Sequence, residues 1–318
     1  MILSSVKFLL NDKLVVIENP DPNQTLLNYI RTELKKTGTK EGCSEGGCGA
    51  CTIVLGELVD NKIIYKAINS CISFVPSLNG KQLLIVEDLV SQNGKLHPVQ
   101  DAMVKFHGSQ CGFCTPGFVM SLFSMFKNNK SLDNELITDS ISGNLCRCTG
   151  YRPIIDAAKS LNKINKNDQF TKNKNKVIQQ LKKIKPKNIY IKKDDKIYFS
   201  PKKIKDLKNI IKKHSNFSFL AGGTDLSLKV TKERKEIPFI IDLKEVKELN
   251  FIKLNKNYLE IGAATPIIKF EDEIKKYYPD FYLVLKRYGS VQIRTVGTIG
   301  GNIATASPIG DSLPILLS

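Results

Sequence analysis

The spacing of three cysteines constrains this 318-residue chain more than any other feature of its sequence. Cys43, Cys48 and Cys51 follow the pattern C-x4-C-x2-C in a glycine-rich loop, and Cys71 lies further along the chain. Plant-type [2Fe–2S] clusters are held by four thiolates with this spacing. Glycines let the backbone wrap closely and turn its N–H groups toward the sulfurs. A zinc site, which prefers paired C-x2-4-C motifs, and a disulfide loop are the alternatives, and the spacing favours the cluster.

The other cysteines form a second group with the patterns C-x2-C and C-x-C: Cys111, Cys114, Cys146 and Cys148. Pro116 and Pro153 stand where helices are expected to begin, because proline is well tolerated in the first helical turn. Helix N-termini favour nearby negative charge, which suits an anionic cluster. A zinc site with four cysteine ligands is the alternative. Since the two groups use all eight cysteines, the sequence favours two clusters.

Composition restricts the class of protein. A hydrophobic fraction of 42% and a charged fraction of 25% are typical of a soluble globular chain. No apolar run approaches the ~18 residues that span a membrane, and residues 1–10 lack the basic start and cleavage site of a signal peptide. Closely spaced cysteines without an export signal indicate metal binding in a reducing cytosol. We therefore expect a cytoplasmic protein that does not contact a membrane.

The formal net charge of +17 is concentrated in one stretch, because residues 161–213 hold 18 Lys, 4 Asp and no Arg. Proteins that read nucleic acid usually combine arginine with stacking aromatic rings, so the charge does not predict nucleic-acid binding. The lysines alternate mainly with asparagine and isoleucine. We interpret the segment as a solvated linker, with a docking surface for an acidic partner as the alternative.

The order of apolar patterns predicts an α+β multidomain chain. In residues 1–85, strands at 4–10 and 13–18 form a hairpin around Asn11-Asp12, a helix follows at 26–34, and strands follow at 52–55, 62–65 and 83–86. Residues 86–162 have the pattern of an all-helical domain. Residues 163–186 are the expected linker, closed by Pro186.

A third domain is expected over residues 187–318, with strands at 189–191 and 197–199 and a helix at 204–211. Another strand ends in Gly222-Gly223-Thr224, whose N–H groups can form a nest for phosphate. A second glycine turn lies at 289–302, and neither turn fits the Rossmann or P-loop pattern. Two separated glycine turns can contact one pyrophosphate from both sides. Most glycine turns, however, are ordinary turns that bind no phosphate.

The motifs C-x-E-G-G-C-G-A-C-T, Q-C-G-F-C-T-P-G and N-L-C-R-C-T-G-Y, in this order, resemble the iron–sulfur part of the molybdenum hydroxylases. That family includes the xanthine dehydrogenases, aldehyde oxidases and carbon monoxide dehydrogenases. The resemblance implies a β-grasp, ferredoxin-like domain and a helical-bundle domain, each with one [2Fe–2S] cluster. It assigns the first cluster to Cys43, Cys48, Cys51 and Cys71, and the second to Cys111, Cys114, Cys146 and Cys148.

The motifs F-L-A-G-G-T-D-L, T-I-G-G-N and S-P-I-G-D are similar to the FAD-binding domain of the same family, which is of the vanillyl-alcohol oxidase-like type. The resemblance implies that FAD contacts Phe219, Leu220, Ala221, Gly222, Gly223, Thr224, Asp225, Leu226, Thr298, Ile299, Gly300, Gly301 and Asn302, with Asp311 nearby. Tyr288 falls where the family has an aromatic residue against the flavin, and a core tyrosine is the alternative.

The order of the three matches resembles the iron–sulfur/FAD subunit of the xanthine dehydrogenases. This implies a partner subunit that carries a molybdenum cofactor, NAD as the electron acceptor, and a hetero-oligomeric enzyme of purine catabolism. Gln110 resembles the residue that touches the partner's molybdopterin, with an ordinary exposed glutamine as the alternative. No residue of this chain is expected to be a catalyst, including His97, His107 and His214.

Two other functions remain open from the sequence. The chain fits an iron–sulfur/FAD subunit of another molybdenum hydroxylase, acting on aldehydes or N-heterocycles. It also fits an iron–sulfur docking module without flavin activity, because the sequence ends at Ser318, before the point where the resembled flavin domain ends. On that resemblance the FAD-binding domain is expected to be incomplete.

Overall fold

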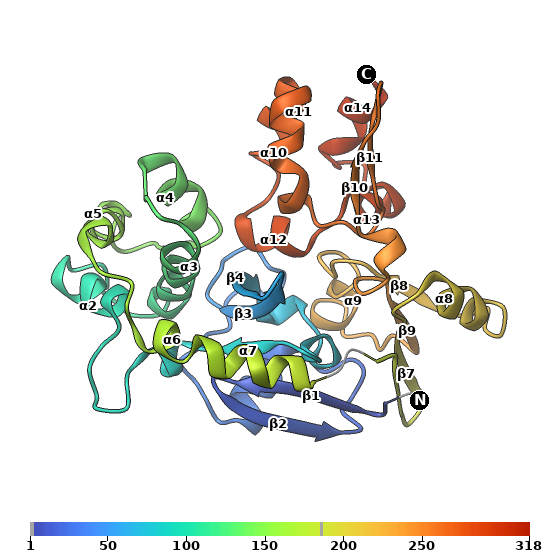
Figure 1. Ribbon diagram of the computed structural model, residues 1–318, viewed down its shortest axis with the longest axis horizontal. Helices are drawn as coiled ribbons and strands as arrows, with labels where there is room; N and C mark the ends of the chain where they lie inside the picture. Colours follow the sequence, from blue (N-terminus) through green and yellow to red (C-terminus); the bar gives the residue numbers. More distant parts are fainter. Residues whose placement is uncertain (1–2, 185–186) are drawn as a thin grey trace.

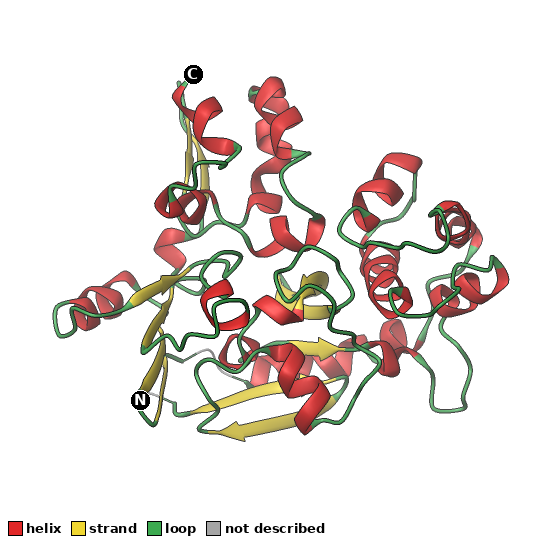
Figure 2. Ribbon diagram, turned by 180° about the vertical axis from the view of Figure 1, so that it is seen from behind, coloured by secondary structure: helices red, strands yellow, loops and turns green. Residues whose placement is uncertain are grey.

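The computed structural model describes residues 3–184 and 187–318. Figure 1 shows the sheet of the first 85 residues low in the molecule, the helices of residues 98–160 at one side, and the elements after residue 187 at the other side and above. Figure 2, seen from behind, shows most strands in the lower half and one two-stranded ribbon above, near the C-terminus. The fold is mixed α and β, as the sequence predicts.

The first part is a five-stranded mixed sheet in the order β2-β1-β5-β3-β4, in which β1 and β5 are parallel. A short helix, α1, and a π-helical turn at Tyr29–Glu33 replace the single expected helix. The cysteine loop lies between that turn and β3. The elements are β1 (Ser5–Leu10), β2 (Lys13–Glu18), α1 (Leu26–Asn28), β3 (Thr52–Val59), β4 (Lys62–Asn69) and β5 (Gln82–Leu84).

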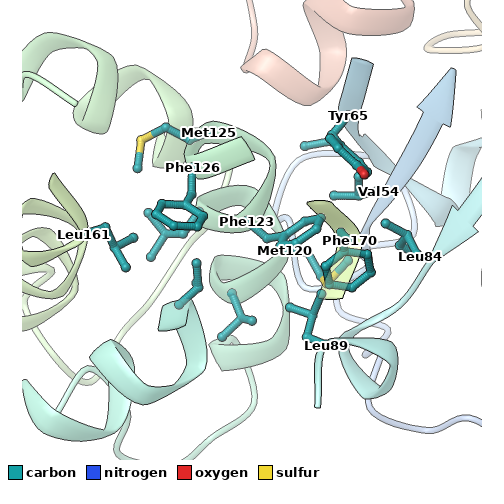
Figure 3. Packing of buried hydrophobic residues seen from close by; sticks show 14 of the residues in the cluster. Val54, Tyr65, Leu84, Leu89, Met120, Phe123, Met125, Phe126, Leu161 and Phe170 are labelled. Carbon is teal, nitrogen blue, oxygen red and sulfur yellow. The ribbon is translucent and has the colours of Figure 1, made fainter. Parts of the chain in front are cut away.

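The second part is helical and surrounds α3, which is buried along most of its length because its residues are apolar on every face. Phe123 and Phe126 of α3 lie at the centre of the packing in Figure 3. The proline in the first turn of α3 and of α5 confirms the two expected helix starts. The helices are α2 (Pro98–Lys105), α3 (Thr115–Asn128), α4 (Asn134–Ile141) and α5 (Arg152–Ser160).

The expectation of a solvated linker at 163–186 is wrong over residues 163–184, and the last two residues of that range lie outside the described chain. Helices α6 (Gln169–Lys172) and α7 (Lys174–Lys183) form there, and α7 packs against β1. Phe170 and Leu181 are buried in the same core as α3, where Figure 3 shows Phe170 beside Phe123. The lysines occupy the outer face of amphipathic helices, so a high charge did not prevent burial of the other face.

The third part has a four-stranded sheet in the order β6-β7-β9-β8, a two-stranded ribbon, and a group of short helices. The expected glycine turn at 289–302 is instead α12 and the first turn of α13. The elements are β6 (Ile189–Lys193), β7 (Lys196–Ser200), α8 (Ile204–Ile211), β8 (Ser218–Leu220), α9 (Leu228–Thr231), β9 (Phe239–Asp242), β10 (Ile252–Leu254), β11 (Leu259–Ile261), α10 (Ile267–Tyr277), α11 (Pro279–Leu285), α12 (Val291–Val296), α13 (Ile299–Thr305) and α14 (Ser312–Leu317).

Across residues 3–184 and 187–318, no helix combines the length and the apolar character that crossing a bilayer requires.

Candidate functional site

The first cysteine loop surrounds the sulfur of Cys43 with backbone donors. The N–H groups of Glu45, Gly47 and Cys48 point at this sulfur, with N···S distances of 3.4, 3.3 and 3.3 Å. Gly46 makes this wrapping possible because it adopts φ = +81°. Burial raises the pKa of the Cys43 thiol, but these backbone N–H groups outweigh it and leave the pKa below its ordinary value. The loop is therefore built to stabilise a thiolate.

Cys51 and Cys71 form the buried pair of the first group, with their sulfurs 3.3 Å apart. Cys51 ends the loop just before β3, and Cys71 lies in a 3₁₀ turn directly after β4. Because β3 and β4 are paired in register, Thr52 lies opposite Asn69 and the two cysteines are brought together. The hydrogen bond between the two thiols is the largest cause that lowers the pKa of Cys51.

The second group lies at the starts of α3 and α5. Cys114 is the N-cap of α3 and shares a thiol hydrogen bond with Cys146, while Cys111 shares one with Cys148. Burial raises the pKa of Cys146, but hydrogen bonds from Thr149 outweigh it and lower the pKa to about 7. Cys111 and Cys148 are exposed, whereas Cys114 and Cys146 are half-buried.

The eight thiols come in pairs, and this fits [2Fe–2S] clusters better than zinc. A tetrahedral zinc ion brings four sulfurs to about 2.3 Å from one atom. Within the described residues, no three Cys, His, Asp or Glu side chains converge closely enough to hold one metal ion. A [2Fe–2S] cluster takes its four thiolates as two separated pairs, one on each iron. The residues present therefore fit two such clusters.

A direct contact joins the two cysteine groups. The N–H of Leu145, the residue before Cys146, donates to the carbonyl oxygen of Cys48 at 3.0 Å. Next to it, the Asn144 side chain donates to the Gly49 carbonyl at 3.1 Å. A Cβ on Gly49 would lie 2.1 Å from the Gly143 carbonyl oxygen, so only glycine permits this approach. One hydrogen bond thus connects a ligand residue of the first group to a neighbour of the second.

A cavity of about 720 Å³ lies in the third part of the chain, within the usual size range of small-ligand sites. Thirteen of the fifteen residues that the resemblance assigns to FAD line it: Phe219, Ala221, Gly222, Gly223, Thr224, Asp225, Leu226, Tyr288, Thr298, Gly300, Gly301, Asn302 and Asp311. Leu220 and Ile299 do not line it, because their side chains pack in hydrophobic cores.

The two glycine segments close this cavity by packing on their surroundings. A Cβ on Gly222 would lie 2.2 Å from the Val296 carbonyl oxygen, and one on Gly300 would lie 2.5 Å from the Ala263 carbonyl oxygen. The Thr298 hydroxyl caps α13 by accepting from the Gly301 N–H at 3.0 Å. These approaches keep backbone donors on the cavity wall, where a dinucleotide phosphate would fit.

Residues that were not assigned to FAD also line the cavity. Ser307, Ile309 and Gly310 belong to the S-P-I-G-D motif, and the residues outside the motifs are Ser218, Leu243, Ala263, Ile293, Ala304 and Thr305. Ala263 and Leu243 follow strands β11 and β9. Their place at the end of a strand, rather than any motif, is therefore the sequence feature that could have predicted them as cavity residues. Tyr288 lies in the wall, where burial and then the Asp311 carboxylate raise its pKa. Gln110 is exposed beside Cys111.

The cavity lies next to the buried cysteine pair. Ile293 lines the cavity and also packs in the small core that contains Cys51, Cys71 and Ile72. The Ser227 hydroxyl donates to the Ile72 carbonyl at 2.9 Å, which fixes the loop after Gly223 against the residue that follows Cys71. The separation between the first cysteine group and the cavity is therefore about one layer of side chains.

Comparison with known proteins gives three family matches in the same order as the three parts. A 2Fe-2S iron-sulfur cluster binding domain matches residues 8–76, a [2Fe-2S] binding domain matches residues 85–159, and the FAD binding domain of molybdopterin dehydrogenases matches residues 191–318. These matches confirm the two iron–sulfur domains and the FAD-binding domain that the sequence predicts.

Three relatives are similar to this chain over different lengths. Xanthine dehydrogenase/oxidase of Mus musculus is 31% identical over 360 residues, which cover 98% of this chain and 27% of the relative. Xanthine dehydrogenase of Blastobotrys adeninivorans is 51% identical over 160 residues, 49% of this chain and 11% of the relative. Aldehyde oxidase 1 of Macaca fascicularis is 45% identical over 159 residues, 49% of this chain and 12% of the relative.

This chain spans about a quarter of the length of the relatives that it matches throughout. The same part of those longer relatives is indicated by the two cysteine groups, by the glycine-lined cavity and by the three family matches. The chain belongs to the molybdenum hydroxylase family and comprises the iron–sulfur and FAD-binding part of such an enzyme.

Proposed function

We propose that this chain is the electron-transfer part of a xanthine dehydrogenase, which receives electrons from a molybdenum cofactor on a partner subunit and delivers them through two [2Fe–2S] clusters to FAD and then to NAD. The observation that carries the proposal is the continuous series of contacts from the exposed Cys111 and Cys148 to the flavin cavity. When bound, the clusters supply one-electron steps and the flavin supplies the exchange between one and two electrons. The protein supplies position and electrostatics.

The entry side of this route is the exposed pair of the second group. Cys111 and Cys148 face solvent, and next to the cysteines the side chains of Phe113 and Leu145 are 47% and 58% exposed. Exposed apolar residues beside a redox site are typical of a surface that a partner covers. Gln110 is exposed at the same place, which supports its contact with the partner's cofactor.

From the half-buried Cys114 and Cys146, the route continues through the hydrogen bond between Leu145 and Cys48 into the first group. Cys51 and Cys71 then lie against Ile72 and Ile293, which borders the flavin cavity. In this arrangement each cysteine group has one pair of thiols on the side that faces the next site of the route. A cluster bound in each group would therefore lie between the exposed thiols, where electrons enter, and the flavin cavity, where they leave. The geometry supports transfer in one order, from the helical domain to the ferredoxin-like domain and then to the flavin.

The choice of xanthine as substrate rests on the relatives. Several xanthine dehydrogenases align with 98–100% of this chain, whereas the aldehyde oxidase, like the xanthine dehydrogenase of Blastobotrys adeninivorans, aligns with 49%. Over the iron–sulfur half alone the identities are similar, at 51% and 45%. An aldehyde-oxidising enzyme is therefore the second candidate, and the substrate pocket of the molybdenum partner separates the two.

The test is to measure iron, acid-labile sulfide and flavin in protein purified without air, together with EPR spectra after reduction by dithionite. We expect about four irons per chain, from two clusters of two irons each, two distinct EPR signals, and bound FAD. NADH should then reduce both clusters when the flavin is present. Zinc in place of iron would contradict the proposal, and four irons without flavin would leave only the docking function.

Changing Gly222 to alanine is expected to weaken FAD binding at least ~10-fold, because the new Cβ would lie 2.2 Å from the Val296 carbonyl oxygen and force the two cavity walls apart. Fluorescence titration of the flavin-free protein with FAD measures the change. Gly310→Ala is the matched control, since it lines the same cavity but its Cβ would lie 3.2 Å from the nearest atom. Equal losses in both variants would refute the steric explanation.

A further inference from the structure

A second cavity, of about 450 Å³, lies between the ferredoxin-like sheet and the FAD-binding domain. Strands β3 and β4 form one wall, and the loops after β7 and β9, the start of α10 and the end of α12 form the others. Figure 1 shows β4 and α12 side by side at the centre of the molecule. Its lining is Leu55, Glu57, Lys66, Ile68, Lys202, Lys244, Glu245, Lys247, Asn250, Pro266, Lys269, Thr295 and Val296. None of these residues belongs to the cysteine groups or the flavin cavity.

The lining holds five lysines and two glutamates, and both glutamates are already neutralised. Glu57 pairs with Lys66 and with Lys81, the latter at 3.6 Å. Glu245 pairs with Lys202 at 3.0 Å and with Lys81 at 3.9 Å. Burial raises the pKa of Glu57, but these ammonium groups outweigh it and hold the pKa well below its usual range. Both carboxylates therefore already form ion pairs with lysine side chains.

Three lysines of the lining remain in excess. Within the described chain, Lys244, Lys247 and Lys269 form no ion pair, and the Lys269 ammonium has only the Asn250 side-chain oxygen at 3.1 Å. Burial, followed by the neighbouring Lys81, lowers the pKa of Lys244 to about 8. Burial and then Lys66 lower the pKa of Lys269. Lys244 is half-buried, and Lys247 and Lys269 lie at the exposed rim. A cavity lined by ammonium groups that have no ion-pair partner favours an anion that fits it.

The start of α10 adds to this positive potential. Pro266 lines the cavity and is the N-cap of this eleven-residue helix, and no side chain caps the first turn. The N–H groups of Ile267 and Lys269 already donate to the carbonyls of Gly297 and Pro266 at 2.9 and 3.0 Å, so this helix start contributes mainly through its dipole, which favours nearby negative charge. Lysine without arginine suits a compact phosphate group that takes point charges rather than a planar carboxylate fork.

We propose that this interdomain cavity binds a small phosphate-bearing polyanion, either inorganic diphosphate or the diphosphate of a nucleotide, between Lys244, Lys269 and the start of α10. The bound anion ties β3, which directly follows Cys51, to α12, whose Ile293 borders the flavin cavity. Occupancy therefore stabilises the arrangement of the ferredoxin-like domain against the FAD-binding domain. This site is independent of the proposed electron-transfer function.

The experiment is isothermal titration calorimetry of the full chain, with its clusters bound, its flavin cavity filled by one equivalent of FAD and the free flavin removed. Inorganic diphosphate is the probe, and sodium chloride keeps the ionic strength constant. We expect one saturable site per chain. A parallel titration with ADP distinguishes the sources: equal or tighter binding of ADP indicates a nucleotide, and binding of inorganic diphosphate alone indicates the free anion.

The variant Lys244→Gln/Lys269→Gln is expected to bind diphosphate at least ~10-fold more weakly, because each lost ammonium removes a charge-assisted contact. The control is Lys253→Gln/Lys256→Gln, which removes the same charge from the exposed β10–β11 ribbon outside the cavity and should bind within twofold of the unchanged protein. If the double variant does not retain its iron and flavin, Lys247→Gln at the exposed rim replaces it, with an expected loss of about threefold. The absence of saturable binding, or equal losses in the cavity and control variants, would overturn the proposal.

Discussion

Replacing Arg294 by alanine is expected to lower the thermal unfolding midpoint by about 6 °C or more, which corresponds to about 3 kcal/mol for a domain of this size. Arg294 is 1% exposed and lies in α12. Its Nη2 donates to both carboxylate oxygens of Asp139 at 2.7 Å, and its Nε donates to Glu271 at 2.5 Å. Alanine would leave these two carboxylates without their shared partner, and the pKa of Glu271 is already raised, first by burial.

The loss of stability should mainly weaken the packing of the helical iron–sulfur domain against the FAD-binding domain. Asp139 belongs to α4 of the helical iron–sulfur domain, whereas Glu271 and Arg294 belong to the FAD-binding domain. The ion pairs therefore connect the helical iron–sulfur domain to the FAD-binding domain. Scanning calorimetry of the cofactor-loaded protein measures the midpoint, and limited proteolysis reports whether the two domains separate.

Two further variants decide whether the buried ion pairs are responsible. Arg287→Ala removes an exposed arginine of the same domain and should change stability by no more than about 0.5 kcal/mol. Arg294→Lys keeps the charge but cannot form the two-oxygen contact with Asp139, so it should fall between the unchanged protein and Arg294→Ala. A midpoint for Arg294→Ala that equals that of Arg287→Ala would show that the ion pairs contribute nothing measurable.

The sequence predicted the elements that depend on local patterns. Alternating apolar residues and the Asn11-Asp12 turn gave the first hairpin within a residue of its observed bounds, and Asn11 adopts φ = +53° as such a turn requires. Cysteine spacing predicted two groups of four thiols, and the assignment of these thiols as cluster ligands stays a prediction. Most of the residues predicted to contact FAD line one cavity, where close backbone approach requires glycine at Gly222 and Gly300.

The sequence could not predict contacts between distant segments. Gln292 is fully buried, and its side-chain N–H₂ group donates to Ser121 and Asn144 at 3.0 Å each, which joins α12 to the helical domain. Nothing near Gln292 in the sequence marks it. The lysines of the second cavity likewise come from β4, the loops after β7 and β9, and the start of α10. The excess of lysine in the sequence therefore did not predict which of these side chains would lie together in the fold.

The linker interpretation failed for a specific reason. Lysine-rich composition describes the solvent-facing side of α7, while the core-facing side consists of Val177, Ile178 and Leu181. Such a short amphipathic pattern is easily overlooked among so many charges. The segment is also fixed by Asp168, whose partners Lys127 and His97 lie 41 and 71 residues away, beyond the reach of any local pattern.

Replacing Asp168 by asparagine is expected to destabilise the protein by about 3–5 kcal/mol, because it removes the counter-charge of a buried lysine. The Lys127 ammonium is 6% exposed and lies 2.7 Å from Asp168 Oδ1. His97 Nε2 lies 3.0 Å from Oδ2. Burial by itself raises the pKa of the Asp168 carboxyl, but His97 and Lys127 outweigh it and hold the pKa well below its ordinary value.

The pH dependence follows from the sign of that shift. Because the folded-state pKa lies below the value of about 3.9 in the unfolded chain, the carboxylate's stabilisation is complete above roughly pH 5 and is lost as the pH falls toward the folded-state pKa. The difference in unfolding midpoint between the unchanged protein and Asp168→Asn should therefore be constant from pH 8 to pH 5. It should shrink between pH 5 and the lowest pH at which the protein remains folded.

Asp133→Asn separates the loss of charge from the loss of a helix cap. Asp133 and Asp168 are both N-caps, of α4 and α6, and each accepts a backbone N–H at 2.8 Å. Asparagine keeps that acceptor, and Asp133 forms no ion pair in the described chain, so this change should cost less than about 0.5 kcal/mol. A similar loss in both variants, or a difference that persists unchanged at acid pH, would mean that the buried charge pair does not hold residues 163–184 in the core.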